Sequence, residues 1–291
     1  MSTVDATTIP RPPRSASSLR PGAGASRLRA FTTLARRRFA LSAHAPREVL
    51  VPLLTPVLFS IVIAPALATI VGSPAGGIDY MTYVSIGTVG LLVPISCMFA
   101  GIGVLVDRET GARRDLLAAP IPRSLVVAGN LAVALTTAGL QIAVLFIAAT
   151  LRGAEFHTSA AGVGWFVSSA VLFAVAMYGG AETLANRVPS QEEYVGAVPA
   201  IAIVPWFFAG SLFPISALPA GLTAFAKVLP LTHALAVMRY GMLGGDAAGL
   251  RDIWGMTNAT VMASLSLAVV TAYAIALTLV AVRVFTRAAV R

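Results

Sequence analysis

The chain has 291 residues, of which 57% are hydrophobic and only 11% are charged, and its mean hydropathy is +0.83. Soluble domains are typically about 45–50% apolar and about 25% charged, so the composition excludes an ordinary soluble protein and predicts one embedded in lipid. The net charge of +9 does not indicate a nucleic-acid partner, because such a binder needs a polar remainder that this chain lacks.

Residues 1–25 are rich in Pro, Ser, Ala and Arg and show neither apolar periodicity nor the apolar core and cleavage site of a signal peptide. We interpret them as a disordered cytoplasmic tail. In residues 26–43, apolar side chains repeat at helical spacing between arginines, which predicts an amphipathic helix on the membrane surface. Alternatively, the arginines only hold the N-terminus on the cytoplasmic side and touch anionic lipid, and the two roles are compatible. The arginines concerned include Arg36, Arg37 and Arg38.

Six later segments are long and apolar enough to cross a bilayer as helices, which takes about 20 residues. They are residues 49–71, 80–106, 125–151, 163–184, 195–213 and 256–285. Prolines interrupt the first and the fifth, where we expect kinks. Glycines at 101, 103, 179 and 180 are expected to let helices approach closely. The predicted fold is therefore an all-α polytopic membrane protein with six transmembrane helices.

The distribution of basic residues predicts the orientation of these helices. With both termini in the cytoplasm, 17 of the 21 basic residues lie inside, a strong positive-inside bias. The four that would lie outside are Arg152, Lys227, Arg239 and Arg251. Lys227 is the only lysine, and together with the abundant alanine this suggests a high-GC bacterial source and hence a bacterial inner membrane.

Residues 214–255, between the fifth and sixth spans, contain two apolar stripes divided by Pro230 and ended by Gly244 and Gly245. Each stripe is too short to cross the membrane. We expect an outer re-entrant hairpin of two short amphipathic helices, because Lys227 and Arg239 would make a seventh crossing costly. An ordinary apolar loop packed on the bundle is the alternative, and it would have no gating role.

The sequence shows no catalytic site. A P-loop needs a lysine after glycine, but the only lysine follows Ala226, so any ATP hydrolysis is expected on another chain. The three histidines are scattered and no cysteine cluster exists, so no metal site is predicted. Glu182 and Gln141 are the main polar residues expected within the spans; an interfacial ion pair with Arg187 is favoured for the first and helix packing for the second.

The loop after the second span, residues 107–123, is the densest polar cluster in the chain. A short helix over about residues 112–119, stopped by Pro120, would expose charges to a partner while Leu116 and Leu117 face the bundle. The loop is thus a candidate docking element, although such a loop is often only a solvated connection.

Two motifs in this order resemble the type-2 ABC exporter permeases, the group with daunorubicin-resistance-like and nodulation-factor-like membrane subunits. The first is D-R-E-x-G with a leucine pair and a proline turn, and the second combines F-P, L-P, P-L-T and a downstream arginine. The residues of the first are Asp107, Arg108, Glu109, Gly111, Leu116, Leu117, Pro120 and Arg123. Those of the second are Phe213, Pro214, Leu218, Pro219, Pro230, Thr232 and Arg239.

The resemblance implies that two copies of a P-loop ATPase, which would carry ATP and Mg, push on the 107–123 loop and the 26–43 helix. It also implies a second permease copy or a related permease, and a role for the 214–255 hairpin in closing the outer end. Arg113 and Arg114 stand where relatives often have an apolar residue and an acid. The charge that this loop would present to the ATPase is therefore expected to differ from the charge in relatives. The expected cargo is an amphipathic drug-like molecule or a lipid, which would make the protein a multidrug or antibiotic efflux component.

Two other classes stay open on the residues alone. A secondary carrier driven by an ion gradient would need carboxylates or histidines near the middle of the membrane, and these are sparse. A non-transport assembly factor would show neither substrate flux nor stimulation of an ATPase.

Overall fold

The computed structural model describes residues 23–43, 79–118 and 122–288, together with positions 54, 58, 62, 65 and 66. Within these residues the fold is helical, apart from one isolated bridge between His157 and Leu243. The predicted first span, 49–71, and residues 1–22 of the predicted tail lie outside the described residues, except for the isolated positions. The elements are α1 (Ala23–Ala43), α4 (Tyr80–Glu109), α5 (Ala112–Ala118), α6 (Arg123–Leu151), α7 (Ala160–Ala185), α8 (Gln191–Val198), the π-helix η2 (Pro199–Ile203), α9 (Val204–Phe208), the 3-10 helix η3 (Ile215–Ala217), α10 (Ala220–Ala226), α11 (Pro230–Met242), α12 (Ala248–Trp254) and α13 (Ala259–Ala288).

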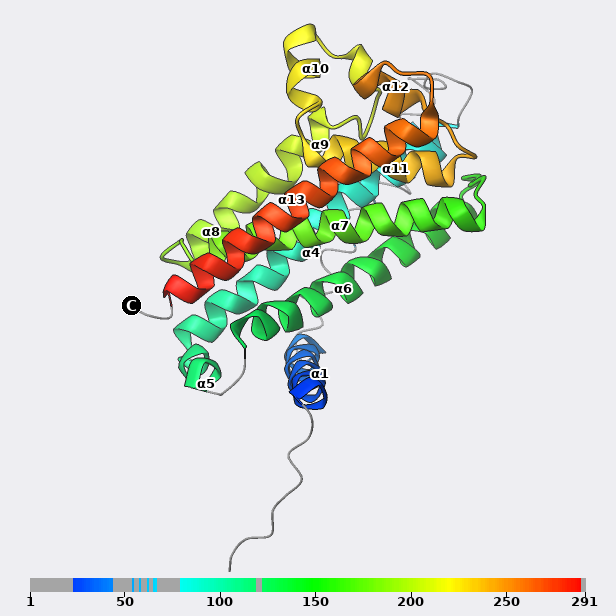
Figure 1. Ribbon diagram of the computed structural model, residues 1–291. Helices are drawn as coiled ribbons and strands as arrows, with labels where there is room; N and C mark the ends of the chain where they lie inside the picture. The colour runs from blue at the N-terminus through cyan, green and yellow to red at the C-terminus, as the bar shows by residue number, and fades with distance from the viewer. Residues whose placement is uncertain are drawn as a thin grey trace, which may run out of the picture.

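Four long helices, α4, α6, α7 and α13, form the bundle (Figure 1). Helix α7 is central and packs against α4, α11 and α13. Helix α5 lies at one end of the bundle, which we call the α5 end, and α10 to α12 lie at the other, the hairpin end. The chain therefore passes between two ends that carry different short elements.

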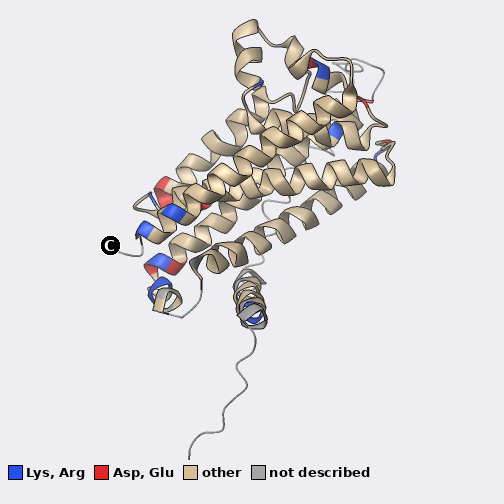
Figure 2. Ribbon diagram, viewed as in Figure 1, with Lys and Arg blue, Asp and Glu red and all other residues tan. Residues whose placement is uncertain are grey.

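Charged residues gather at these two ends, and the ribbon between them is almost free of charge (Figure 2). Hydrocarbon tolerates few charges, so this pattern fits a membrane-embedded bundle. Four described helices are long and apolar enough to cross a membrane, and a fifth candidate is the pair α10 and α11, which is bent by 78°. The structure confirms the predicted spans 80–106, 125–151, 163–184 and 256–285 as helices of this kind, but it does not confirm six spans.

The ends of the long helices follow local sequence signals. Asp79 begins α4 by accepting a hydrogen bond from the Thr82 amide at 3.0 Å, and Ser159 begins α7 by accepting one from the Gly162 amide at 3.1 Å. After α4, Gly111 adopts a positive φ of 79°, which other residues rarely tolerate. This turn lets α5 start directly after α4.

The predicted fifth span, 195–213, is three consecutive helical pieces, α8, η2 and α9, rather than one helix. Pro199 is the first residue of η2 and Pro205 is the second residue of α9, so a proline lies at each break, where its missing amide hydrogen interrupts the helical hydrogen bonds. The run lies antiparallel along α4: Tyr194 donates to the Met98 carbonyl at 2.9 Å, and further on the Trp206 indole donates to the Gly87 carbonyl at 2.8 Å. The run thus passes from the α5 end to the hairpin end.

Two of the predicted glycine contacts are close. A side chain at Gly101 would collide with the hydroxyl of Tyr194, and one at Gly179 would meet the backbone of α13 at Leu277, 2.8 Å away. A side chain at Gly180 would meet no described atom within 4 Å. Glycine therefore sets the approach of α8 to α4 and of α13 to α7.

The bent pair in the 214–255 segment matches the predicted hairpin in position but not in environment. Eleven of the 13 residues of α11 are buried, so this helix is a packed part of the bundle and not an amphipathic helix at an interface. It contacts α7, α13 and α4. The segment also holds a third helix, α12, that the apolar stripes did not predict.

The predicted N-terminal helix is present and begins at Ala23, three residues earlier than expected and within the segment predicted as a tail. It packs against α6, where Leu34 and Ala35 lie beside Gly129. Leu28 and Phe39 are 65% and 38% exposed, so part of its apolar surface faces away from the bundle.

Candidate functional sites at the two ends of the bundle

An ion pair joins the last turn of α4 to α1 at the α5 end. Nη2 of Arg37 lies 3.1 Å from Oδ1 of Asp107, and the two side chains are 38% and 12% exposed. The pair is separated by 70 positions in sequence. It therefore links the start of the loop predicted as a docking element to the helix predicted to lie on the membrane surface.

The next residue, Arg108, fastens the same turn of α4 to the loop between α7 and α8. Its guanidinium donates to the carbonyls of Ala185, Val188 and Pro189 at 3.3, 2.9 and 2.8 Å. Arginine suits this task because its planar fork presents several donors in fixed directions. Any force on this turn would thus be passed to α1 and to the α7–α8 loop together.

Helix α5 lies on the bundle through both a charged and an apolar side chain. The Arg113 guanidinium sits 5.0 Å from the centre of the Phe285 ring of α13, and Leu116 packs against the core. Burial lowers the pKa of Arg113, and the charge of Glu182 acts in the opposite direction. Glu109 at the end of α4 is exposed, no described residue forms an ion pair with it, and its carboxylate lies beside these anchored groups.

The structure thus brings together Arg37, Asp107, Arg108, Glu109 and Gly111 at the α5 end. Arg36 is exposed on α1. Pro120 lies outside the described residues, as do the side chains of Arg38, Leu117 and Arg123.

The polar residues predicted within the spans are both buried. Ser96 of α4 donates to the Gln141 side-chain oxygen of α6 at 2.5 Å, which links two helices as a packing role requires. Glu182 is fully buried and accepts from Tyr178 at 2.5 Å and from Asn186 at 3.2 Å. Both of these partners lie one helical turn away, whereas Arg187 is exposed.

At the hairpin end, the Arg239 side chain is buried among backbone carbonyls. Its guanidinium donates to Gly210 at 2.7 Å, to Ser211 at 3.1 Å and to Tyr83 at 3.4 Å, and it stacks 3.6 Å from the centre of the Tyr83 ring. Gly210 and Ser211 lie just beyond the C-terminal end of α9, the end at which a helix dipole is negative. Arg239 therefore joins α11 to α4 and to the end of α9.

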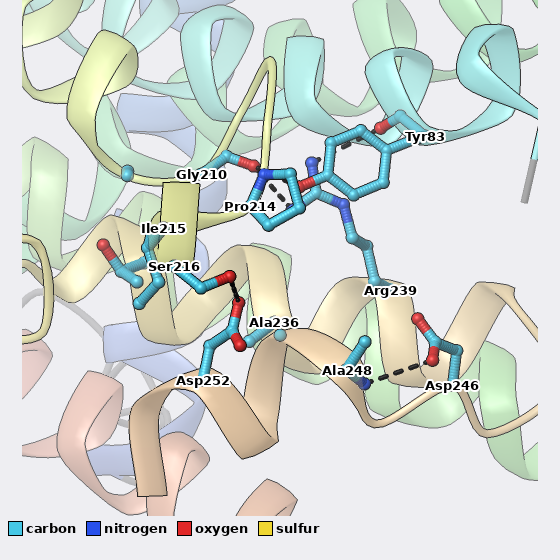
Figure 3. Close-up of a pocket in the computed structure, with 13 residues that line it drawn as sticks. Tyr83, Gly210, Pro214, Ile215, Ser216, Ala236, Arg239, Asp246, Ala248 and Asp252 are labelled. Atoms are coloured by element: carbon cyan, nitrogen blue, oxygen red, sulfur yellow. Dashed lines mark hydrogen bonds between the residues drawn. The ribbon is translucent and has the colours of Figure 1, made fainter. Parts of the chain in front are cut away.

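A cavity of about 80 Å³ lies beside this arginine, between α11, α12 and η3 (Figure 3). Three of the predicted hairpin residues line it, namely Pro214, Thr232 and Arg239. The other four do not. Leu218 caps the end of η3, Pro219 directly precedes α10, Pro230 begins α11, and Phe213 directly precedes Pro214 of the cavity wall.

Sequence reasoning missed several residues of this site. Tyr83 comes from the start of α4, and Asp246 and Asp252 come from the region of α12. The two carboxylates in a mostly apolar segment were a usable signal, since acids at such a place are uncommon. Nothing in the sequence indicated that Tyr83 contacts Arg239, because 156 positions separate the two residues. Among the described residues no group of histidine, cysteine and acidic side chains could hold a metal ion.

Taken together, an apolar helical bundle with charges at its ends and polar anchors at both defines a multi-pass membrane protein. The family model of the ABC-2 type transporter matches residues 29–243, well over half of the chain, and the protein belongs to this family. It carries the membrane permease domain of such a transporter, which has no ATPase activity, and ABC-2 permeases typically pair with ABC ATPase subunits. No curated protein matches the chain.

Proposed function

We propose that the protein is the membrane subunit of an ATP-driven exporter of the daunorubicin-resistance-like and nodulation-factor-like kind. It works with two copies of a P-loop ATPase and a second permease, in the bacterial inner membrane, with six spans and both termini in the cytoplasm. Its cargo is an amphipathic drug-like molecule or a lipid, and drug efflux would confer antibiotic resistance. The family match supports the class, and the apolar bundle supports an amphipathic cargo.

The observation that carries this proposal is the anchoring of the Asp107–Arg108 turn. Asp107 is paired to α1 and Arg108 is bonded to the α7–α8 loop, while Glu109, the next residue of α4, is exposed. In this proposal Glu109 receives the ATPase, and the two anchors convert its push into movement of α1, α4 and α7. Arg36 and α5 complete the docking surface.

The hairpin end would close the opposite side of the pathway. Arg239 holds α11 against α4 and the end of α9 through backbone carbonyls, and among the described residues no carboxylate forms an ion pair with it. Such hydrogen bonds can be exchanged for water when the end opens. The proposal thus assigns Pro214, Thr232 and Arg239 to the outer gate.

Purification of the protein from its native membrane in mild detergent tests the partner. We expect a P-loop ATPase at stoichiometric amounts in the eluate, identified by mass spectrometry. Repeated recovery without an ATPase would contradict the proposal and favour a carrier or an assembly factor.

Replacing Glu109 with alanine tests the coupling surface. Glu109→Ala should insert normally and should uncouple transport from ATP hydrolysis, because the carboxylate is exposed and supports no described contact. The matched control is Glu192→Ala, which removes an exposed carboxylate from the first turn of α8 at the same end. Full transport by the Glu109 variant, or equal loss in both, would refute the docking role.

A further inference from the structure

One histidine of α11 joins the helices of the hairpin end through buried hydrogen bonds. His233 is only 3% exposed. Its Nε2 lies 2.9 Å from the carbonyl of Lys227, the residue that caps α10, and its Nδ1 lies 3.2 Å from the Ser266 hydroxyl of α13. The indole of Trp254, the last residue of α12, donates to the same hydroxyl at 2.8 Å. Four helices therefore meet at one titratable side chain.

The partners of His233 determine where the hydrogens of this network lie. A carbonyl only accepts, so Nε2 of His233 must carry a hydrogen, and an indole only donates, so the Ser266 oxygen accepts from Trp254. In a neutral imidazole Nδ1 is then an acceptor, and the Ser266 hydroxyl donates to it. Every donor has an acceptor, in one line from Trp254 through Ser266 and His233 to the Lys227 carbonyl.

A second proton on the imidazole breaks this line. Nδ1 becomes a donor, so the Ser266 oxygen has to accept from two N–H groups, and the hydrogen of the hydroxyl loses its acceptor. Among the described residues, neither an ion pair nor a hydrogen bond joins the imidazole to a charged side chain. Burial without a counter-charge disfavours the charged form of a histidine. The closed hairpin end thus suits the neutral imidazole and not the protonated one.

Other ionisable side chains lie on the elements that pack around His233. At the hairpin end, α7 contributes none, and the described ones on α4, α11, α12, α13 and the turns beside them are Tyr80, Tyr83, Lys227, Arg239, Tyr240, Asp246, Arg251, Asp252 and Tyr273. None of these side chains bonds to the imidazole, and Lys227 reaches it only through its backbone carbonyl.

We propose that His233 is an acid-sensitive clamp, which holds α10, α11 and α12 against α13 while its imidazole is neutral and releases them when it is protonated. A freely exposed histidine takes up its proton near pH ~6.5. The released chain therefore binds more protons than the closed end below that pH, so the closed end keeps its stability above pH ~6.5 and loses it as the pH falls. The clamp adds a response to acid to the outer gate proposed above, but it stands on these hydrogen bonds and does not depend on transport.

The pH dependence of unfolding tests the clamp without any substrate. The midpoint of thermal unfolding of the purified protein in detergent should fall by about 3–6 °C between pH 7.5 and 5. Hydrogen exchange, corrected for the intrinsic effect of pH, should increase at pH 5 in peptides of α10 to α12 and not in α6. His157→Gln, which replaces an exposed histidine of the same end, should keep the wild-type profile. A midpoint and an exchange pattern that stay constant over this range would overturn the proposal.

Two independent variants separate the clamp from a purely structural contact. His233→Gln keeps a donor for the Lys227 carbonyl but takes up no proton, so its midpoint should be nearly the same at both pH values. Trp254→Phe keeps a ring beside His233, where the ring centres are 5.6 Å apart, and frees the Ser266 oxygen to accept from a protonated imidazole. Its fall in midpoint should therefore move to higher pH. An undiminished pH response in His233→Gln, or an equal loss at every pH in Trp254→Phe, would contradict the clamp, and either variant is sufficient if the other does not fold.

Discussion

At the scale of single residues, Arg239 shows what makes a buried cation tolerable in an apolar bundle. No carboxylate among the described residues pairs with it, yet three carbonyls and the Tyr83 ring surround its guanidinium. Carbonyl oxygens and the face of an aromatic ring are both negative, so together they replace part of the lost hydration. The shape of the guanidinium matters as much as its charge, because one atom could not reach all of these partners.

We therefore expect Arg239→Lys to destabilise the protein although the charge is kept. A lysine ammonium is a compact point charge and cannot both stack on Tyr83 and span three carbonyls. The loss of charge-assisted hydrogen bonds should cost about 1.5–3 kcal/mol, seen as a lower midpoint of thermal unfolding in detergent. Arg152→Lys, at an exposed arginine of the same end, is the control. Equal midpoints for the two variants would show that only the charge is needed.

At the scale of elements, the packing of α7 on α13 depends on one glycine of an adjacent pair. The backbone of α13 lies where a side chain at Gly179 would be, with Leu277 C and Thr278 N at 2.8 and 2.9 Å. Backbone atoms cannot move aside as a flexible side chain can. At the neighbouring Gly180, no atom of the described residues lies within 4 Å of the place that an added methyl group would occupy, so this glycine provides an internal comparison.

Alanine at these two positions should give opposite results. Gly179→Ala must push α13 away from α7 and should cost about 1–3 kcal/mol through overpacking. Gly180→Ala should be neutral or stabilising by up to about 1 kcal/mol, because alanine favours a helix over glycine. Thermal unfolding of both variants measures the difference. Comparable destabilisation by the two substitutions would contradict the dependence of this interface on Gly179.

The sequence predicted an element correctly where the element's own residues determine it, and less well where packing with other elements does. Apolar length located α4, α6, α7 and α13 to within three residues at every end, because crossing a bilayer sets a minimum length. It failed for α11, whose apolar stripe indicated one buried face although the helix is enclosed on nearly all sides. Enclosure is decided by which elements pack around a helix, and a local pattern does not contain that information.

The candidate sites show the same limit. The D-R-E motif was found from the sequence, but the ion pair with Arg37 and the bonds to the α7–α8 loop were not, since they join residues 70 to 81 positions apart. Likewise Arg239 was identified, whereas its partners Tyr83 and Gly210 were not. A sequence motif identifies candidate residues, but the residues that they contact are known only from the fold.

At the scale of the whole molecule, the charge distribution gives the bundle a direction. Arg152, Lys227 and Arg251 belong to the loops and short helices of the hairpin end, whereas most other described basic residues lie at the α5 end. Short loops rich in arginine are retained in the cytoplasm during insertion. The α5 end should therefore face the cytoplasm.

Cysteine labelling of intact cells tests this orientation. The single native cysteine, Cys97, is fully buried, so the unmodified protein should give little background with a membrane-impermeant maleimide. A cysteine in place of Glu155 should react from outside, whereas one in place of Glu192 should react only after the cells are opened. Both positions are exposed, so access depends on the side of the membrane alone. The reverse labelling pattern would show that the α5 end faces the outside of the cell.

The π-helix η2 between α8 and α9 affects which way the side chains of α9 and the carbonyls after it face. A π-helical turn contains one more residue than an α-helical turn over the same stretch. If the same residues were wound as an α-helix instead, everything after them would be rotated by about 100° and advanced by about 1.5 Å. Trp206 would then leave the Gly87 carbonyl, and the Gly210 carbonyl would turn away from Arg239. A single surplus residue at Pro199–Ile203 thus fixes the angular setting by which α9 meets α4 and α11.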